Sequence, residues 1–573
     1  MEEFLLSFSQ AEDTYVYVYQ AILRYAFPIL AAFLLIRTVK PLLTFEREPE
    51  IWAWLCLTNG KRLPITHWEN VIGRSKRSDV VVNIPTISRN HAVLTRYDDG
   101  SWSISDAHSK SGVFVNGEKV DICALDEEDI ITIGGVDMKL MPISRKQEQI
   151  LANLRTKAAK PLTSVLNLLI LTAIQVLMCV SYMFTVSTLH TADVLLGFGG
   201  IFVCQWALLI FYLCIRKPSF EVETIAFFLC TLGMAAIAAV TPGESLKQLI
   251  ALVMGLALFL CIGWAARDLE RAKKIRYIAG VAGIILLLIT LVFGKEYHGA
   301  KNWLLIGSLS IQPSELSKVC FVFVGASTMD RIMNKRNIIL FIAYTLVICA
   351  CLAVMNDFGT ALIFFVAFLL IAYLRSGSVG TIALACTSLG FAGVLVLKIA
   401  PHALRRFSSW RHIWEDPLGV GYQQTRALMC IASGGLFGLG AGNGLMRKIF
   451  AADSDVVFAT VSEEWGLLVS VMMVLCIIAL ALFALRSAAV SRSSFYTIGA
   501  CTAAGILLVQ SIFNALGTVD VLPLTGVTFP FVSNGGSSML CAWGLLAFVK
   551  AADTRQSASF AVRQSKEGVL ADE

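Results

Sequence analysis

Apolar segments, each separated from the next by a short polar stretch, fill most of the chain after Thr163. Because a helix that crosses a membrane needs about 20 mostly apolar residues, these segments predict a series of membrane-spanning helices. They lie at residues 163–186, 193–215, 222–241, 246–265, 276–293, 314–330, 337–354, 358–374, 378–398, 466–485, 496–516 and 525–550. With an earlier segment from about Tyr15 to Ile36, the pattern predicts about thirteen spans. The segment at 314–330 is the weakest of them, because it is short and begins with polar residues.

A stretch of different character separates the first span from the others. From about Trp52 to Pro142 the apolar clusters are short, as at residues 80–82, turn residues are frequent, and nothing is long enough to cross a bilayer. Short apolar clusters between turns are typical of β-strands, so this stretch predicts a soluble β domain. A basic linker, Arg145 to Lys160, leads back to the membrane.

The first apolar segment predicts an anchor helix and not a signal peptide. The chain begins without a basic n-region, and Arg37 and Lys40 follow the segment in place of a small-residue cleavage site. The predicted domains are an anchor at 1–45, a β domain at 50–143, a basic linker at 144–161, an additional transmembrane hairpin at 162–216, a polytopic domain at 222–551 and a tail at 552–573.

Composition agrees with a membrane protein, since 56% of the 573 residues are hydrophobic and only 15% are charged. The net charge of +6 is small, and the charged residues are distributed by side of the membrane, so no nucleic-acid partner is indicated. The fifteen cysteines show no paired spacing and no CxxC or Cys/His cluster. This argues against disulfides and against a zinc site.

Basic residues predict the orientation of the chain in the membrane. They gather in alternate short loops, such as 216–217, 267–276 and 486–492. Because cytoplasmic loops carry the excess of Lys and Arg, these loops, the β domain and the C-terminus are predicted to be cytoplasmic. The N-terminus and the loop at 401–455 are then predicted to lie outside.

Motifs in the β domain resemble those of forkhead-associated (FHA) domains. In chain order they are Gly73-Arg74-Ser75, Ser88-Arg89-Asn90-His91, Ser109-Lys110-Ser111-Gly112 and Val115-Asn116-Gly117. The resemblance implies a cytoplasmic β-sandwich that binds phosphothreonine, whose phosphate suits a guanidinium and loop hydroxyls. The residues implied for this site are Arg74 and Ser88 on the phosphate, Arg89, Lys110 and Ser111 beside it, and Asn116 on the peptide backbone. Gly73 and His91 resemble residues that shape the loops, and a binding platform indifferent to phosphate is the alternative.

Four blocks in the second half of the chain resemble the FtsW/RodA/SpoVE (SEDS) family. They are Gly299-Ala300-Lys301-Asn302-Trp303 with residues 311–318, then 356–361, then 421–424 with 434–438, and last 522–526 with 530–538. The resemblance covers about Val222 to Lys550. It implies a multispanning α-helical membrane protein with about ten core helices, to which this chain adds about three, and a glycosyltransferase that polymerises lipid II into peptidoglycan.

Asp455 matches a position whose aspartate is thought to act in catalysis in this family. A carboxylate there could accept the proton of the attacking sugar hydroxyl as the lipid pyrophosphate leaves, which is general-base catalysis. A structural role, such as capping the helix that begins near Val456, is the alternative. Asp453 is a second candidate for the same proton.

Charged residues in or near membrane spans are costly and mark polar cavities. This cost and the family resemblance indicate as substrate-binding candidates Lys318, Glu315, Glu463, Glu464, Asp357, Lys301 and Gln423. Each has a plainer alternative: Lys318 could neutralise Glu315 three residues away, and Asp357 could cap a helix. One of Glu463 and Glu464 could simply be a hydrogen-bonded polar residue.

The chain departs from the family pattern at several positions. Asn302 and Ser310 stand where Arg is common, Asn534 stands where Tyr is common, and residues 450–453 differ from the usual Pro-Glu and His. Phosphate handling by Lys301, Arg447 and Lys448 could compensate. The resemblance indicates no protein-bound metal cluster and leaves a divalent cation, Mg or Mn, open.

The expected partners are lipid II, a class B penicillin-binding protein with transpeptidase activity, and a phosphothreonine-bearing protein with its Ser/Thr kinase. The main hypothesis is therefore a regulated peptidoglycan glycosyltransferase of the bacterial plasma membrane. Two alternatives stay open: a flippase of the lipid-linked precursor, and a non-catalytic scaffold that responds to phosphorylation.

Overall fold

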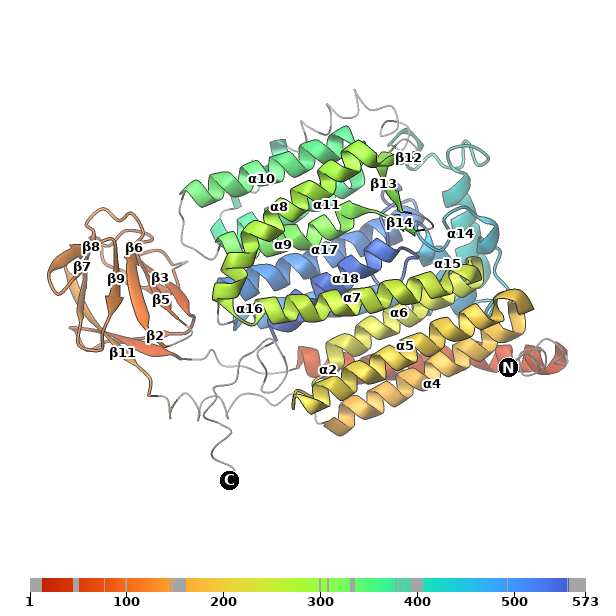
Figure 1. The fold of residues 1–573 in the computed structure, drawn as a ribbon, viewed down its shortest axis with the longest axis horizontal. Helices are drawn as coiled ribbons and strands as arrows, with labels where there is room; N and C mark the ends of the chain where they lie inside the picture. The colour runs from red at the N-terminus through yellow and green to blue at the C-terminus, as the bar shows by residue number, and fades with distance from the viewer. Residues whose placement is uncertain are drawn as a thin grey trace.

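The computed structural model contains a β domain beside a bundle of long helices, as Figure 1 shows. It describes residues 13–44, 51–76, 78–97, 100–144, 147, 161–297, 300–306, 309–329, 335–376, 379–380, 383, 385–388, 390, 393, 404, 407–491, 493–553 and 555. More than half of the expected span at 378–398 and most of the expected linker lie outside these residues.

The β domain is a sandwich of two sheets. One sheet has the strand order β2-β1-β11-β10-β7-β8 and the other β4-β3-β5-β6-β9. All pairs are antiparallel except β3 with β4. Alternate residues of both sheets meet in one apolar core, which includes Leu55, Ile72, Leu94 and Ile131. The strands are β1 (Ala53–Leu57), β2 (Arg62–Ile65), β3 (Glu69–Gly73), β4 (Val80–Val81), β5 (Ala92–Arg96), β6 (Trp102–Asp106), β7 (Val113–Val115), β8 (Glu118–Val120), β9 (Ile122–Leu125), β10 (Ile130–Ile133) and β11 (Val136–Pro142).

Asn116 and Gly117 form the two-residue turn between β7 and β8. Their φ angles are 51° and 86°. A turn with two left-handed residues matches the twist of a hairpin, and Asn-Gly is the pair that most readily adopts it. The dipeptide therefore sets the register of this hairpin, in which Val115 faces Glu118.

Ten helices of the described chain are long and apolar enough to cross a membrane, and they make the protein a multi-pass membrane protein. The helices before the β12 strand are α2 (Asp13–Leu43), α4 (Pro161–Thr185), α5 (Thr188–Cys214), α6 (Glu221–Val240), the short η1 (Pro242–Glu244), α7 (Ser245–Ala266) and α8 (Leu269–Phe293). Those after it are α9 (Pro313–Met329), α10 (Lys335–Val354), α11 (Phe358–Ser376), α14 (Tyr422–Gly434), η2 (Met446–Lys448), α15 (Val457–Trp465), α16 (Leu467–Ala489), α17 (Ser494–Thr518) and α18 (Gly536–Ala551).

Two helices form the centre of the bundle. Nearly all of α6 and α18 is buried, so their apolar residues face other helices and not lipid. The expected span at 525–550 is wrong in its first part, because α18 begins only at Gly536. Gly526 and Phe531 have left-handed backbone angles, with φ of 69° and 65°, which a continuous helix cannot contain.

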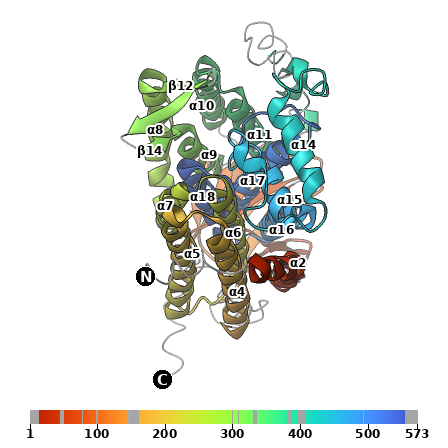
Figure 2. The ribbon, with the colours of Figure 1, turned by 90° about the vertical axis from the view of Figure 1, so that its right-hand side faces the viewer.

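Irregular structure gathers at the end of the bundle that lies far from the β domain (Figure 1). It includes a small sheet of β12 (Lys295–Tyr297), β13 (Ala300–Ile306) and β14 (Leu309–Ile311). Figure 2 looks onto this end and shows α14 and α15 beside α16 and α17. The contact of α14 with α15 depends on Gly434, where a Cβ atom would lie 2.4 Å from the carbonyl oxygen of Ser462.

Candidate functional site

Asp455 lies in the turn immediately before α15, and α15 lies at the end of the bundle away from the β domain (Figure 1). Its side chain is half-buried, and its backbone N–H donates to the carbonyl oxygen of Ala451 at 3.0 Å. Helix α15 has Val456 as its N-cap residue, without a side-chain cap hydrogen bond. The alternative that the Asp455 side chain caps this helix stays a prediction.

Asn514 holds the backbone of this turn in place. The side-chain amide of this α17 residue donates to the carbonyl oxygens of Asp455, at 3.0 Å, and Ser454, at 3.3 Å, and to that of Val527 at 2.9 Å. A Cβ atom on Gly526 would lie 3.5 Å from Oδ2 of Asp455, so the loop before α18 borders the carboxylate. Sequence reasoning did not find Asn514, although a buried amide in an apolar helix is a visible signal.

Asp453 lies close by in a different environment. It is 6% exposed, and its Oδ2 accepts hydrogen bonds from the Thr241 hydroxyl at 2.6 Å and the Asn534 side-chain amide at 2.8 Å. Asn534 also donates its backbone N–H to the Asp453 carbonyl oxygen. Asp453 and Asn534, two positions at which the chain departs from the family pattern, are thus hydrogen-bonded to each other. A carboxylate held this way is less suited than Asp455 to accept a proton from a substrate.

Glu463 and Glu464 hold the loop at residues 440–446. Glu463 accepts the backbone N–H groups of Leu445, at 2.9 Å, and Met446, at 2.8 Å. Glu464 accepts the N–H of Gly442 at 3.1 Å and the hydroxyl of Tyr182 at 2.6 Å. Both carboxylates are buried. The alternative for this pair was that one of the two is a hydrogen-bonded polar residue, and in the structure both are.

Asp357 caps α11, as its plainer interpretation had it. Oδ1 accepts the N–H of Thr360 at 3.2 Å, which is the N3 bond of a helix cap. Oδ2 accepts from the side chains of Asn302 at 3.1 Å and Gln312 at 3.3 Å. The residue thereby joins α11 to the small sheet and to the start of α9.

Lys318 pairs with Glu315 across 2.7 Å, and their side chains are only 1% and 7% exposed. This is the internal neutralisation expected at a spacing of three residues. Lys301 donates to the carbonyl oxygen of Leu291 at 2.8 Å, in the last turn of α8, and Gln423 donates to that of Phe450 at 3.0 Å. In this structure, these candidates for substrate contact all make hydrogen bonds within the protein.

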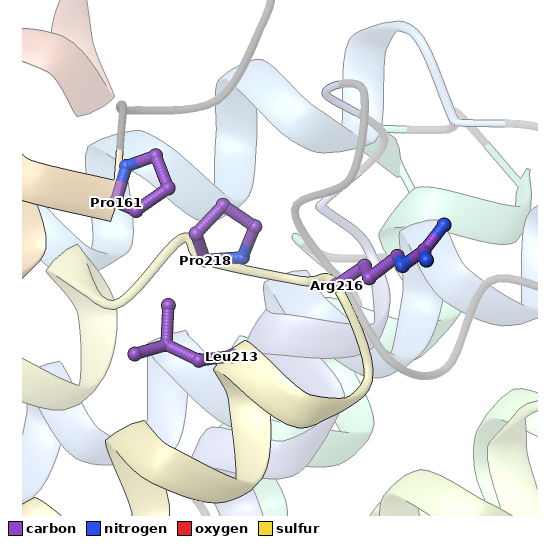
Figure 3. A pocket seen from close by; sticks show the side chains of 4 residues that line it. All are labelled: Pro161, Leu213, Arg216 and Pro218. Carbon is purple, nitrogen blue, oxygen red and sulfur yellow. The ribbon is translucent and has the colours of Figure 1, made fainter.

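No group of three or more His, Cys, Asp or Glu residues that could hold a metal ion occurs in the described part of the chain. A pocket of about 320 Å³ is lined by Pro161, Leu213, Arg216 and Pro218. Arg216 points away from the three apolar side chains (Figure 3), and the pocket lies at the end of α4 remote from Asp455.

The FHA-like motifs meet at one edge of the β sandwich. Arg74, Arg89, Lys110 and Ser111 are exposed there, and Ser88 is half-buried. Hydrogen bonds join the three loops: Arg74 N–H donates to the carbonyl oxygen of Ser88, and Lys110 N–H donates to the Ser88 hydroxyl, each at 3.0 Å. The edge therefore presents three exposed cations beside two hydroxyls.

Gly73 and His91 shape these loops. A Cβ atom on Gly73 would lie 2.1 Å from the carbonyl oxygen of Arg89, which no side chain could tolerate. His91 is fully buried and accepts the N–H of Ser88 at Nδ1, so that Nε2 carries the proton and donates to the carbonyl oxygen of Gly112 at 3.0 Å.

Asn116 is exposed and makes two hydrogen bonds within the domain. It accepts the N–H of Ile130 at 3.0 Å and donates to Asp129 at 2.8 Å. The N–H of Asp126 and the amide of Asn116 lower the pKa of Asp129. The loop that follows β9 is thereby tied to the Asn116–Gly117 turn.

Two family models match the chain. The FtsW/RodA/SpoVE model, described as a cell cycle protein, matches residues 243–558, and the FHA domain model matches residues 70–134. The FHA match contains all the motif residues described above.

Similar proteins agree with these matches. Peptidoglycan glycosyltransferase RodA of Mycobacterium tuberculosis H37Rv is 28% identical over 324 residues, which are 53% of this chain and 69% of the relative. Probable peptidoglycan glycosyltransferase FtsW of Escherichia coli O157:H7 is 32% identical over 274 residues, 45% of this chain and 65% of the relative. A chain in the solved structure reported as "Structural coordination of polymerization and crosslinking by a peptidoglycan synthase complex" is 24% identical with a TM-score of 0.50, covering 58% of this chain and 96% of that one.

The solved structure supports the fold of the helical part, and the family model covers more than half of the chain. The protein described here belongs to the FtsW/RodA/SpoVE family and carries an FHA domain between its first and second described transmembrane helices.

Proposed function

We propose that this protein is a peptidoglycan glycosyltransferase that polymerises lipid II at the outer face of the cytoplasmic membrane. Its family and its relatives named as peptidoglycan glycosyltransferases support the activity. The observation that carries the proposal is the half-buried carboxylate of Asp455, on a turn that Asn514 holds from a neighbouring helix.

In the proposed reaction, Asp455 acts as general base. Its carboxylate accepts the proton of the acceptor sugar hydroxyl while that oxygen attacks the anomeric carbon of the donor. A new glycosidic C–O bond forms, the bond to the lipid pyrophosphate breaks, and the pyrophosphate leaves with the electron pair. The turn fixes Asp455 before the substrate arrives, which is the positioning that such a step requires.

Cations near this turn are suited to the lipid pyrophosphate. Arg447 and Lys448 are exposed on η2, which precedes Asp455 by a few residues. Lys318 is a weaker candidate because Glu315 neutralises it. We therefore assign the pyrophosphate to Arg447 and Lys448, with Glu463 and Glu464 holding the loop that carries them.

The proposed orientation places the FHA domain and the C-terminal tail in the cytoplasm, and the N-terminus and Asp455 outside. The basic residues of the short loops support it. The position of the β domain and of α15, which Asp455 immediately precedes, at opposite ends of the bundle agrees with it (Figure 1). The domain division remains a prediction, with the FHA domain at 50–143 and the SEDS domain at 222–551, and the family models match residues 70–134 and 243–558 within or near these bounds.

The FHA domain is proposed to recruit or gate the enzyme by binding a protein that a Ser/Thr kinase has phosphorylated on threonine. The exposed cations Arg74, Arg89 and Lys110 and the nearby hydroxyls support phosphate binding. A class B penicillin-binding protein is the proposed transpeptidase partner, which would cross-link the glycan outside the cell.

The test is glycan polymerisation from labelled lipid II by the purified full-length protein in detergent. We expect long glycan from the wild type and at least about a hundredfold less from Asp455→Asn, because a general base contributes roughly 10²–10⁴-fold to rate. Glu415→Gln removes a carboxylate from an exposed position of the outer segment and should leave the yield unchanged. If the wild type makes no polymer but moves lipid II across vesicle membranes, the flippase alternative replaces the proposal. Full activity of Asp455→Asn would reject the assignment of the base.

A further inference from the structure

The helices α2 and α4 lie outside the segment that the family model matches, yet both reach the loop at residues 440–446. The match begins at residue 243, whereas α2 and α4 end at Leu43 and Thr185. The two helices extend between the β-domain end of the bundle and the end that carries α15, in opposite chain directions (Figure 1). This loop leads directly into η2, with Arg447 and Lys448.

Tyr182, near the end of α4, is bonded to the carboxylate that holds the loop. Its side chain is fully buried. The hydroxyl donates to Oε2 of Glu464 at 2.6 Å and accepts the indole N–H of Trp465 at 3.0 Å. The other oxygen of Glu464 accepts the N–H of Gly442. Because a carboxylate keeps its geometry best when both oxygens are bonded, Tyr182 orients Glu464 toward the loop.

Thr185, one turn further along α4, touches the same loop directly. A Cβ atom on Gly442 would lie 2.5 Å from the Thr185 hydroxyl, and Gly442 has a φ of 73°. The loop backbone therefore packs against α4 at a distance that only glycine permits.

Gln20, on α2, makes a second connection. Its Oε1 accepts the side-chain N–H of Asn443 at 2.8 Å, and its Nε2 lies 3.4 Å from the carbonyl oxygen of Ala441, to which it donates. Two helices from outside the family segment thus hold three consecutive residues of the loop, 441–443, from two sides.

We propose that Tyr182 and Gln20 are positioning residues of the glycosyltransferase, and that α2 and α4 together brace the 440–446 loop and hold Arg447 and Lys448 in place for the lipid pyrophosphate. The expected effect on activity rests on the proposed function. The contacts by which α2 and α4 brace the loop do not depend on it. Since the FHA domain is inserted between these two helices, the brace gives the cytoplasmic domain a physical connection to the outer site.

Hydrogen exchange of the full-length protein, followed by mass spectrometry of peptides that cover residues 439–448, tests the brace. Tyr182→Phe removes one hydroxyl and keeps the packing, and Gln20→Met removes both amide contacts at a half-buried position where folding is not at risk. Loss of a hydrogen bond to a charged group raises the equilibrium constant for local opening of the loop by a factor of about ten or more. We therefore expect at least about tenfold faster exchange in Tyr182→Phe. A smaller increase is expected in Gln20→Met.

The matched control is Tyr212→Phe. Tyr212 is also fully buried and donates to a carboxylate, Oε1 of Glu223, at 2.9 Å, but at the opposite end of the bundle. It should leave exchange at 439–448 as in the wild type. Unchanged exchange in both Tyr182→Phe and Gln20→Met would overturn the proposal, as would equal acceleration in Tyr212→Phe.

A second experiment measures kcat and KM of the same variants with lipid II as substrate. We expect a several-fold higher KM with a smaller change in kcat, because the brace acts on the cations that bind substrate and not on Asp455. A fall in kcat alone would contradict this assignment. If the wild type is inactive, the proposed function fails, and the exchange result still decides whether the brace exists.

Discussion

Asp453 and Asp455 are two residues apart and lie in different surroundings. Asp453 is nearly covered and accepts two side-chain hydrogen bonds, whereas Asp455 is half-buried and its backbone carbonyl accepts a hydrogen bond from Asn514. The sequence names both as candidates and cannot separate them, because the partners come from Thr241, Asn534 and Asn514, which are distant in the chain. Only the fold brings these residues together.

The Glu315–Lys318 pair gives a residue-scale prediction. Lys318→Met should destabilise the protein by about 3–5 kcal/mol, because it leaves a buried carboxylate without its counter-charge. Glu315→Gln with Lys318→Met removes both charges and should recover most of this stability. Thermal unfolding in detergent measures both variants.

Polymerisation by the double variant then separates two roles of Lys318. Recovered stability with recovered activity means that the pair is structural. Recovered stability with lost activity means that Lys318 also contacts the pyrophosphate, which would contradict our assignment of that role to Arg447 and Lys448. The single variant Glu315→Gln keeps the lysine and serves as the control for both readings.

Interactions between residues close together in the sequence could be predicted more readily than contacts between residues far apart in it. The spacing of Glu315 and Lys318 and the cap at Asp357 follow from local rules of helices, and the structure has both. Tyr182 had no such signal. Its partner, Glu464, is 282 positions away in the chain, and a tyrosine in an apolar helix is unremarkable by itself.

At the scale of elements, hydropathy predicts which segments are helical more accurately than it predicts the residues at which the helices begin and end. It cannot detect the break before α18, because nearly all of the residues at 525–535 are themselves apolar or small. It also treats α6 like any other span, although 94% of its most apolar window is buried inside the protein. Length and composition decide whether a helix can span the membrane, while packing decides which helix lies at the centre.

Helices α4 and α5 attach to the bundle through a buried amide pair. The side chains of Gln175 and Gln205 donate to each other at 2.9 Å, and Gln175 also donates to the hydroxyl of Thr231 on α6 at 3.0 Å. Polar groups inside a membrane bundle join helices because lipid offers them no other partner. The amide pair thus joins α4 to α5, and the bond from Gln175 to Thr231 links this hairpin to α6.

Gln205→Leu should therefore loosen the hairpin. It leaves Gln175 without its main partner, and we expect a loss of about 0.6–2 kcal/mol in stability from the range for interhelical hydrogen bonds in membranes. Thermal unfolding with hydrogen exchange over residues 161–214 measures it. Gln205→Glu keeps the shape and an acceptor for the Gln175 amide, so it should retain more stability than Leu. An unchanged melting temperature and unchanged exchange in Gln205→Leu would show that the pair contributes nothing.

At the scale of the whole molecule, the C-terminal end of the helical part is anchored to the start of the central helix α6. Arg555 lies 2.7 Å from Asp553 and 3.4 Å from Glu221, the first residue of α6. Burial acts to raise the pKa of Asp553, but the guanidinium of Arg555 more than offsets it and lowers the pKa. The charged carboxylate therefore stabilises the fold at neutral pH, and this contribution is lost as the pH falls through the lowered pKa.

The FHA domain contacts the helical part at the turn between α16 and α17. Nδ1 of His67 lies 3.0 Å from the carbonyl oxygen of Ser491, and the hydroxyl of Ser494 donates to Glu69 at 2.5 Å. Glu69 begins β3, whose other end leads to Arg74, and Ser494 begins α17, whose other end carries Asn514. One strand and one helix thus connect the proposed phosphate site with the turn of Asp455.

A phosphothreonine peptide, selected from a library by binding to the full-length protein, should therefore change the rate of glycan synthesis. Coupling between sites is typically worth 1–3 kcal/mol, so we expect a change of about fivefold or more. Arg74→Ala should abolish peptide binding, while Arg62→Ala, at an exposed position on β2 outside the motif loops, should not. Ser494→Ala should keep peptide binding and reduce the response, because it removes the bond between α17 and the FHA domain. If the peptide binds the wild type and the rate stays the same, the domain recruits the enzyme without gating it, and the route along β3 and α17 carries no signal.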